Sequence, residues 1–140
     1  FVAGYLGMPR IRVLEVASFY SMFNLEPVGE HFVQLCRTTP CWLRGSDDLR
    51  AAAKDVTGCG LGETSEDGKF TVVEVECLGA CCNAPMVQIN DEYYEDLTPE
   101  SFKAVLESLK RGETPDAGSR TGRSGSEPEG GLTTLTTEGA

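Results

Sequence analysis

Positive charge, histidine and long apolar segments are all scarce in this 140-residue chain. The 12 Lys and Arg residues are outnumbered by 22 Asp and Glu residues, which gives a formal net charge of −10 at pH 7. Binding of nucleic-acid phosphates needs a basic face, so this composition argues against a nucleic-acid partner. No apolar run approaches the ~18 residues expected of a membrane-spanning helix, so no direct membrane insertion is expected. The acidic balance favours solubility or a basic partner surface.

The length of the chain suffices for one domain with its own core and a tail. The chain begins at Phe1, without an initiator Met and without the pattern of a signal peptide. We therefore expect it to be cut or processed, with a further N-terminal region before residue 1.

Cysteine is the residue type that carries the most information here. Cys36 and Cys41 form a C-x4-C pair, and Cys77 and Cys81 form a C-x3-C pair after a gap of 35 residues. Two close pairs on short turns can bring four thiolates to one centre, which suits zinc or an iron–sulfur cluster. Six cysteines are too few for a typical disulfide scaffold, which favours metal-binding thiols, with a secreted three-disulfide domain as an alternative. Cys82 follows Cys81 directly, and spacing alone does not choose between them.

The apolar pattern predicts a βαβ unit, then a β-hairpin, then a final helix. The expected elements are a strand at 31–35, a helix capped by Ser46 and ended by Gly58, a strand at 70–76, a strand at 86–90, a short strand from Tyr93, and a helix that starts at Thr98 and ends by Gly112. This order describes an α/β fold, a small mixed thioredoxin-like sheet with flanking helices, preceded by the end of a helical region. The C-x-x-C pair of thioredoxin chemistry is absent, so thiol–disulfide exchange is not expected.

Topology then explains how the two cysteine pairs meet. Two strands joined by a helical crossover are expected to be parallel, so both cysteine segments leave the sheet at the same edge. The segment 36–41 contains Pro40 and two threonines, which predicts a loop there.

The cysteine spacing and the shortage of histidine limit which kinds of metal centre are possible. Cysteine ligands of structural zinc are usually separated by fewer residues than Cys36 and Cys41 are. The plant-type ferredoxin pattern also begins with C-x4-C, although the spacing of the other cysteines here is not plant-type. A Rieske centre needs two histidines, and His31 is the only one, so that class is excluded. We favour a [2Fe-2S] cluster, with structural zinc as the alternative. Cys59 lies in a glycine-rich loop that lacks the last glycine of a dinucleotide fingerprint, and we interpret it as a small buried residue.

Three regions are predicted along the chain. Residues 1–25 are the C-terminal part of a helical region, and residues 26–112 are the thioredoxin-like [2Fe-2S] domain. Residues 113–140 are an extended or disordered tail, because their Gly, Ser, Thr and Pro content lacks the periodicity that a packed core requires.

Over nearly its whole length the chain resembles the thioredoxin-like [2Fe-2S] subunits of respiratory NADH:quinone oxidoreductase (complex I). The resemblance is carried by residues 16–24, 36–41, 62–64, 75–81 and 83–86, and continues at 88–90, 93–97 and 130–135. It implies that Cys36, Cys41, Cys77 and Cys81 hold the cluster. Cys82 departs from the family pattern, in which a small non-cysteine residue is common at that place.

The resemblance also implies a role. The subunit would be a non-catalytic redox component without a substrate site, exchanging electrons with the FMN of a larger, NADH-binding flavoprotein, with other peripheral-arm subunits as further partners. It would lie peripherally on the cytoplasmic side of the bacterial inner membrane or, alternatively, in the mitochondrial matrix. Equivalent small subunits of NAD-linked hydrogenases and formate dehydrogenases, and a structural zinc-binding module, are the alternatives.

Overall fold

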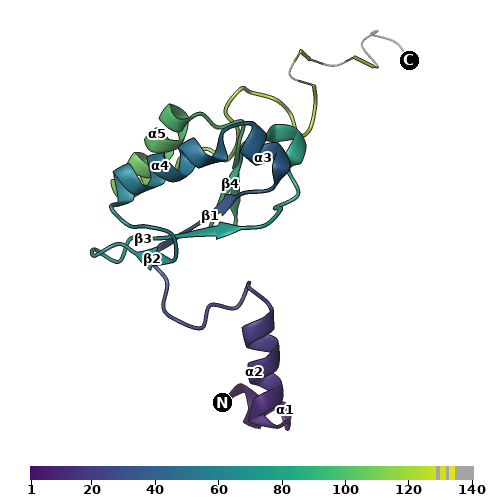
Figure 1. Cartoon of the computed structure of the whole chain (residues 1–140), viewed down its shortest axis with the longest axis vertical. Helices are drawn as coiled ribbons and strands as arrows, with labels where there is room; N and C mark the ends of the chain where they lie inside the picture. The colour runs from purple at the N-terminus through teal and green to yellow at the C-terminus, as the bar shows by residue number, and fades with distance from the viewer. Residues whose placement is uncertain (129, 132, 135–140) are drawn as a thin grey trace.

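A six-stranded sheet with the order β2-β3-β1-β4-β5-β6 is the centre of the molecule. The computed structural model describes residues 1–128, 130–131 and 133–134 (Figure 1). The strands are β1 (His31–Cys36), β2 (Glu63–Thr64), β3 (Phe70–Val75), β4 (Val87–Ile89), β5 (Glu92–Glu95) and β6 (Gly118–Ser119). The helices are α1 (Val2–Leu6), α2 (Arg10–Phe19), α3 (Thr39–Leu43), α4 (Ser46–Thr57), α5 (Pro99–Lys110) and the short 3-10 helix η1 (Cys81–Asn83).

The pairing of β1 with β3 confirms the predicted parallel βαβ unit. Cys36, the last residue of β1, lies beside Val75, the last residue of β3. β4 pairs antiparallel with β1 on the other side, and β5 pairs antiparallel with β4 as the predicted hairpin. The two strands that lead into the cysteine pairs therefore end side by side at one edge of the sheet.

Helices α4 and α5 pack against each other and against the sheet, and together they enclose the main core. Leu49, Ala52 and Ala53 form the buried apolar face of α4. Gly58 ends α4 with φ 75°, a left-handed conformation that glycine adopts without strain. Thr98 caps α5 as predicted, because its side chain accepts a hydrogen bond from the Ser101 amide at 3.2 Å.

One predicted helix start is wrong in detail. The N-cap of α4 is Gly45 rather than Ser46, because only Arg44 and Gly45 separate α4 from α3 and Gly45 has the non-helical φ of 94°. The N-terminal region is helical only to Phe19, and it is broken at Gly7 (φ 63°) into two short helices. Pro9 precedes α2 as its N-cap and is not its first helical residue.

The N-terminal helices lie apart from the sheet in Figure 1, and none of the side chains of α2 is buried. Ile11, Leu14 and Phe19 are all exposed. None of the helices formed by the described residues is long and apolar enough to cross a membrane.

The tail runs back along the sheet. Gly118 and Ser119 form β6, which pairs in parallel with β5 at Tyr94 and Glu95. The sequence predicts no regular structure after Glu113, since a two-residue strand has no hydrophobic pattern to reveal it. The segment 130–135, one of those that carry the resemblance, lies partly outside the described residues.

Candidate metal centre

Cys36 and Cys41, the inner pair, are enclosed by the fold. Cys36 is the last residue of β1 and Cys41 lies within α3, and their exposed fractions are 2% and 0%. They pack with Ala84 and Met86 in a second, smaller core. The predicted loop is therefore wrong for Cys41: Pro40 occupies the first turn of a helix, where proline is tolerated because no amide donor is needed.

Cys77 and Cys81, the outer pair, lie on the segment that follows β3. Their sulfur atoms are 3.3 Å apart. The Gly79 amide donates a hydrogen bond to the Cys77 sulfur at 3.4 Å, and Gly79 has φ 90°, a conformation that strongly favours glycine. Cys77 is exposed and Cys81 is half-buried. The outer pair thus closes a tight turn at the molecular surface.

Thr38 links the two pairs. Its hydroxyl lies 3.6 Å from the Cys36 sulfur and is also one of the groups that lower the pKa of Cys77. α3, which carries Cys41, contacts η1, which begins at Cys81. The structure therefore brings all four predicted ligands to one edge of the sheet, and sequence reasoning missed Thr38 because a threonine between two cysteines has no distinctive pattern.

Two further contacts hold the segments around the pairs. The Arg37 guanidinium donates to the Glu74 carboxylate at 2.5 Å and so joins the residue after Cys36 to β3. The Tyr93 hydroxyl donates to the Leu78 carbonyl at 2.7 Å and so joins the outer turn to β5. Arg37 is largely exposed, so its ion pair contributes little free energy and acts mainly on geometry.

The electrostatics of the thiols differ between the pairs. Burial, followed by the neighbouring Cys36 thiol, raises the pKa of Cys41 to about 12. The Cys81 thiol, the Gly79 amide and the Thr38 hydroxyl lower the pKa of Cys77. The hydrogen bond with the Cys77 thiol, followed by burial, raises the pKa of Cys81. A metal that binds here must displace protons, since only thiolates are good ligands.

The donor set fits a [2Fe-2S] cluster. All six cysteines are free. Four thiolates are the ligands of such a cluster, two for each iron, and the structure supplies them as two pairs. Within the described residues, no three or more His, Cys, Asp or Glu side chains gather closely enough to hold a single metal ion.

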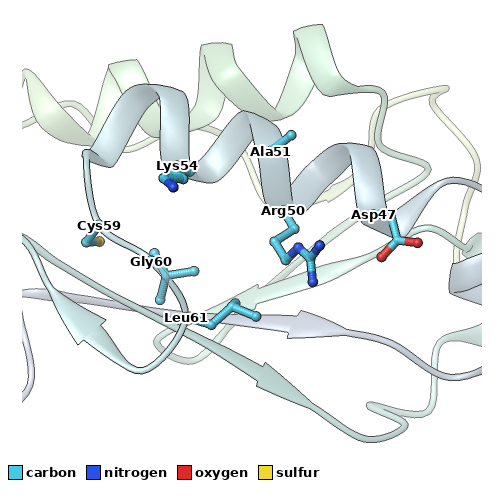
Figure 2. Close-up of a pocket in the computed structure, with 8 residues that line it drawn as sticks. Asp47, Arg50, Ala51, Lys54, Cys59, Gly60 and Leu61 are labelled. Atoms are coloured by element: carbon cyan, nitrogen blue, oxygen red, sulfur yellow. The ribbon is translucent and has the colours of Figure 1, made fainter.

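Cys59 does not belong to this centre. It is 4% exposed, and its thiol donates to the Thr57 hydroxyl at 3.2 Å. It lines a cavity of about 440 Å³ between α4 and the glycine-rich loop, together with Arg50, Lys54 and Leu61, and none of the four predicted ligands lines that cavity (Figure 2). The Gly60 amide in this loop donates to the Glu63 carboxylate at 2.7 Å. Cys59 is therefore a small buried residue, as predicted.

A parallel β1–β3 pair that leads two cysteine pairs to one edge is the arrangement of a thioredoxin-like sheet with four thiols at that edge. The chain belongs to the thioredoxin-like [2Fe-2S] ferredoxin family, whose family model matches residues 1–110. This confirms the predicted fold class and cofactor.

Comparison with known proteins adds more specific relatives. The chain is 56% identical over 110 residues to an NADH-quinone oxidoreductase subunit of Rickettsia bellii, covering 79% of this chain and 66% of that protein. It is 50% identical over 134 residues to the mitochondrial NADH dehydrogenase (ubiquinone) flavoprotein 2 of Dictyostelium discoideum, covering 96% of this chain and 54% of that protein. The chain therefore spans less than two thirds of the length of these relatives.

Solved structures support the fold. An NAD⁺-reducing [NiFe]-hydrogenase in its air-oxidised state superposes with a TM-score of 0.72 at 19% identity, covering 79% of this chain and 19% of that chain. A cysteine-to-serine variant of the thioredoxin-like [2Fe-2S] ferredoxin from Aquifex aeolicus superposes with a TM-score of 0.50 at 20% identity, covering 61% of this chain and 91% of that chain. At these identities the likeness concerns the fold.

Proposed function

We propose that Cys36, Cys41, Cys77 and Cys81 hold one [2Fe-2S] cluster and that the chain is an electron-transfer subunit of an NADH:quinone oxidoreductase. The observation that carries this proposal is the convergence of two cysteine pairs at the ends of adjacent parallel strands. The relatives with at least half of their aligned residues identical are named as subunits of NADH dehydrogenases, which supports the choice of complex.

Each pair has its own part in holding the cluster. The inner pair would fix one iron against the small core around Met86, where water has little access. The outer pair would hold the other iron at the surface, where an electron has the shorter path to a partner. When bound, the cluster supplies one-electron transfer, and the Gly79 amide stabilises the anionic sulfur of Cys77.

The partner in this proposal is the larger flavoprotein that binds FMN and NADH, together with other peripheral-arm subunits. An apolar surface supports a docking site at the same edge: Trp42 and Leu43 follow Cys41 in α3 and are 56% and 70% exposed. The chain is then a non-catalytic redox subunit that has no substrate site of its own. We place it peripherally, on the cytoplasmic side of a bacterial inner membrane or, alternatively, in a mitochondrial matrix.

The division of labour along the chain stays a prediction. Residues 1–25 would continue a helical region, residues 26–112 would carry the cluster, and residues 113–140 would form the tail. The exposed apolar side chains of α1 and α2 support the first of these assignments.

The alternative of an equivalent subunit in an NAD-linked hydrogenase or formate dehydrogenase has weaker support. Its structural likeness to a hydrogenase rests on 19% identity, whereas the NADH dehydrogenase subunits reach 50% and more. Purification from native membranes, followed by identification of the co-eluting flavoprotein, distinguishes the two complexes.

Metal analysis tests the cluster itself. The full chain, purified without oxygen, should be brown and contain iron and acid-labile sulfide in equal amounts, with a paramagnetic signal on reduction. Cys81→Ser should lose or badly perturb this cluster, whereas its neighbour Cys82→Ser is the matched control. A colourless chain that contains one zinc would overturn the proposal.

A further inference from the structure

The tail contacts the residues that directly follow the outer pair. Arg123 and Asp96 form an ion pair whose side chains are only 12% and 7% exposed. The Arg123 Nε also donates to Asp96 Oδ2 at 3.0 Å. The same guanidinium donates to the main-chain carbonyl of Cys82 at 2.9 Å. One tail side chain is therefore bonded both to the end of β5 and to the residue beside Cys81.

Asp96 is the point at which tail, hairpin and cysteine turn meet. Its backbone has φ 52°, an uncommon conformation for a residue other than glycine. Its amide donates to the Asn83 carbonyl at 2.8 Å, and its carboxylate accepts a hydrogen bond from Ser119 at 2.5 Å. Movement of the tail would thus be passed to Asn83, the last residue of η1.

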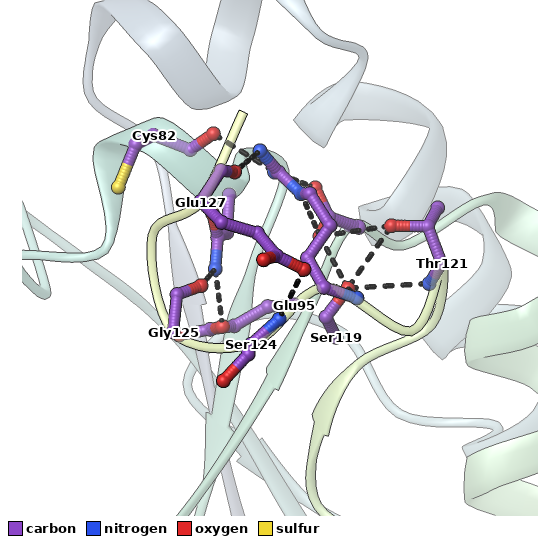
Figure 3. A network of polar contacts seen from close by, with 10 residues as sticks. Cys82, Glu95, Ser119, Thr121, Ser124, Gly125 and Glu127 are labelled. Atoms are coloured by element: carbon purple, nitrogen blue, oxygen red, sulfur yellow. Dashed lines mark hydrogen bonds and ion pairs between the residues drawn. The ribbon is translucent and has the colours of Figure 1, made fainter. Parts of the chain in front are cut away.

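Asn83 makes a second, independent contact between η1 and the tail. Its side chain is buried, with 2% exposure, and its amide nitrogen donates to the Glu95 carboxylate at 2.7 Å and to the Gly125 carbonyl at 2.5 Å (Figure 3). Its backbone amide donates to the Ala80 carbonyl at 3.0 Å and closes the turn around Cys81. The tail therefore contacts η1 at its last two residues, Cys82 and Asn83, directly after Cys81.

The approach of the tail is fixed before it reaches the turn. β6 pairs with β5, and the Arg120 amide donates to the Glu95 carbonyl at 3.0 Å. The Arg120 guanidinium lies over the ring of Tyr94, 5.2 Å from its centroid. Beyond this point the Arg123 guanidinium donates to the Glu127 carbonyl at 2.9 Å, which folds the tail back on itself.

We propose that residues 119–127 are a clamp that sets the position of Cys81, with Arg123 as its central positioning residue. The outer pair lies on an exposed segment whose only regular structure is the three-residue η1, so few contacts of its own fix the Cys81 sulfur. The clamp supplies those contacts from a segment about 40 residues further along the chain. Groups that orient a metal ligand in this way commonly change metal affinity by about 10- to 100-fold when they are removed.

This inference rests on the proposed assignment of Cys81 as a cluster ligand, so the test starts from the wild-type full chain with its cluster. The variant is Arg123→Gln, and the matched control is Arg111→Gln, which removes the same charge from an exposed pair between α5 and Glu113. The rate at which the visible absorbance disappears in excess chelator is expected to rise about tenfold in Arg123→Gln and to stay at the wild-type value in Arg111→Gln.

A spectroscopic readout separates positioning from general loss of stability. The paramagnetic signal of the reduced Arg123→Gln chain should change in shape, because one iron has lost its fixed ligand geometry. Arg123→Lys keeps the positive charge but lacks the planar guanidinium with its several N–H donors, so it should recover only part of the wild-type cluster lifetime. An unchanged signal together with an unchanged rate of cluster loss would overturn the clamp.

Ser119→Ala keeps the test valid should Arg123→Gln fail to fold. It removes one hydrogen bond to Asp96 and leaves the ion pair in place, so cluster loss should accelerate less but in the same direction. No acceleration in a folded Ser119→Ala chain would contradict the inference. A wild-type chain that holds no cluster would instead refute the proposed function, so the two failures are distinguishable.

Discussion

The inner and outer cysteine pairs are held at the same edge of the sheet by different physical means. Cys36 and Cys41 lie on a strand and a helix, are almost completely buried, and share a core with Met86. Cys77 and Cys81 lie on a surface turn that contains Gly79 and is bonded to the tail through the residues that follow it. The first half of the site is part of the folded core, and the second half is positioned by polar contacts from elsewhere in the chain.

This difference predicts different dynamics in the two halves. A side chain within the core is displaced only when much of the domain unfolds, whereas an exposed turn can open locally at a smaller free energy. The cluster should therefore be lost first from the outer side. Substitutions in each half of the site can increase or remove this difference in stability between the two pairs.

Replacing one ligand in each half should give the largest effect and the clearest comparison. Cys41→Ser and Cys77→Ser should each abolish the cluster, measured as iron content. In the metal-free chain, however, Cys41→Ser buries a hydroxyl and should lower the free energy of unfolding by about 1–3 kcal/mol, whereas the exposed Cys77→Ser should stay within about 0.5 kcal/mol of wild type. Urea unfolding measures both, and equal effects would remove the distinction between the pairs.

Met86→Ala tests the core beneath the inner pair. Met86 is 1% exposed and fully packed, so its truncation should cost about 2–5 kcal/mol in free energy of unfolding. Met22→Ala is the control, because Met22 is 76% exposed. The measurement is thermal or urea unfolding of the metal-free chains. Equal stability of the two variants would contradict the packing of Met86.

Acid should weaken the contacts on the outer side. Burial alone would raise the pKa of Asp96, but the hydrogen bonds from Arg123 and Ser119 outweigh it and hold the pKa below its usual value. A lowered pKa in the folded chain means that the stabilisation is present above the unfolded pKa of about 3.9 and is lost as the pH falls toward the folded value. The free energy of unfolding should therefore fall below about pH 4, and fall less steeply in Asp96→Asn. Parallel curves for the two chains would contradict this.

Cys82→Ser should have the smallest effect. The contact that Cys82 makes with Arg123 uses its main-chain carbonyl, and its thiol is exposed. Both the visible spectrum and the rate of cluster loss should stay within experimental error of wild type. A large change would show that Cys82, and not Cys81, supplies the fourth sulfur.

The sequence is most informative where regular periodicity and cysteine spacing coincide. β1, β3 and α4 follow from alternating or helical apolar patterns, and their order predicts where the cysteines meet. The family match confirms the cofactor that this spacing favours. The assignment of the four ligands stays a prediction that the geometry supports.

Other features depend on contacts that no local pattern encodes. The sequence does not predict α3, because Pro40 suggests a break in regular structure, although proline fits the first turn of a helix. β2 and β6 contain two residues each and exist only because β3 and β5 offer partners. Arg123 lies in a segment without periodicity, and only the folded chain brings it to Asp96 and the cysteine turn.

The two-residue strands β2 and β6 are the outermost strands of the sheet that the structure describes. A long flat rim would offer a row of free amides and carbonyls to which a second chain could add in register, whereas such short rims offer almost none. Shortening the protein before Gly118 would leave the edge of β5 at Tyr94 and Glu95 without its partner strand. The tail strand β6 therefore covers part of a sheet edge to which another chain could otherwise add.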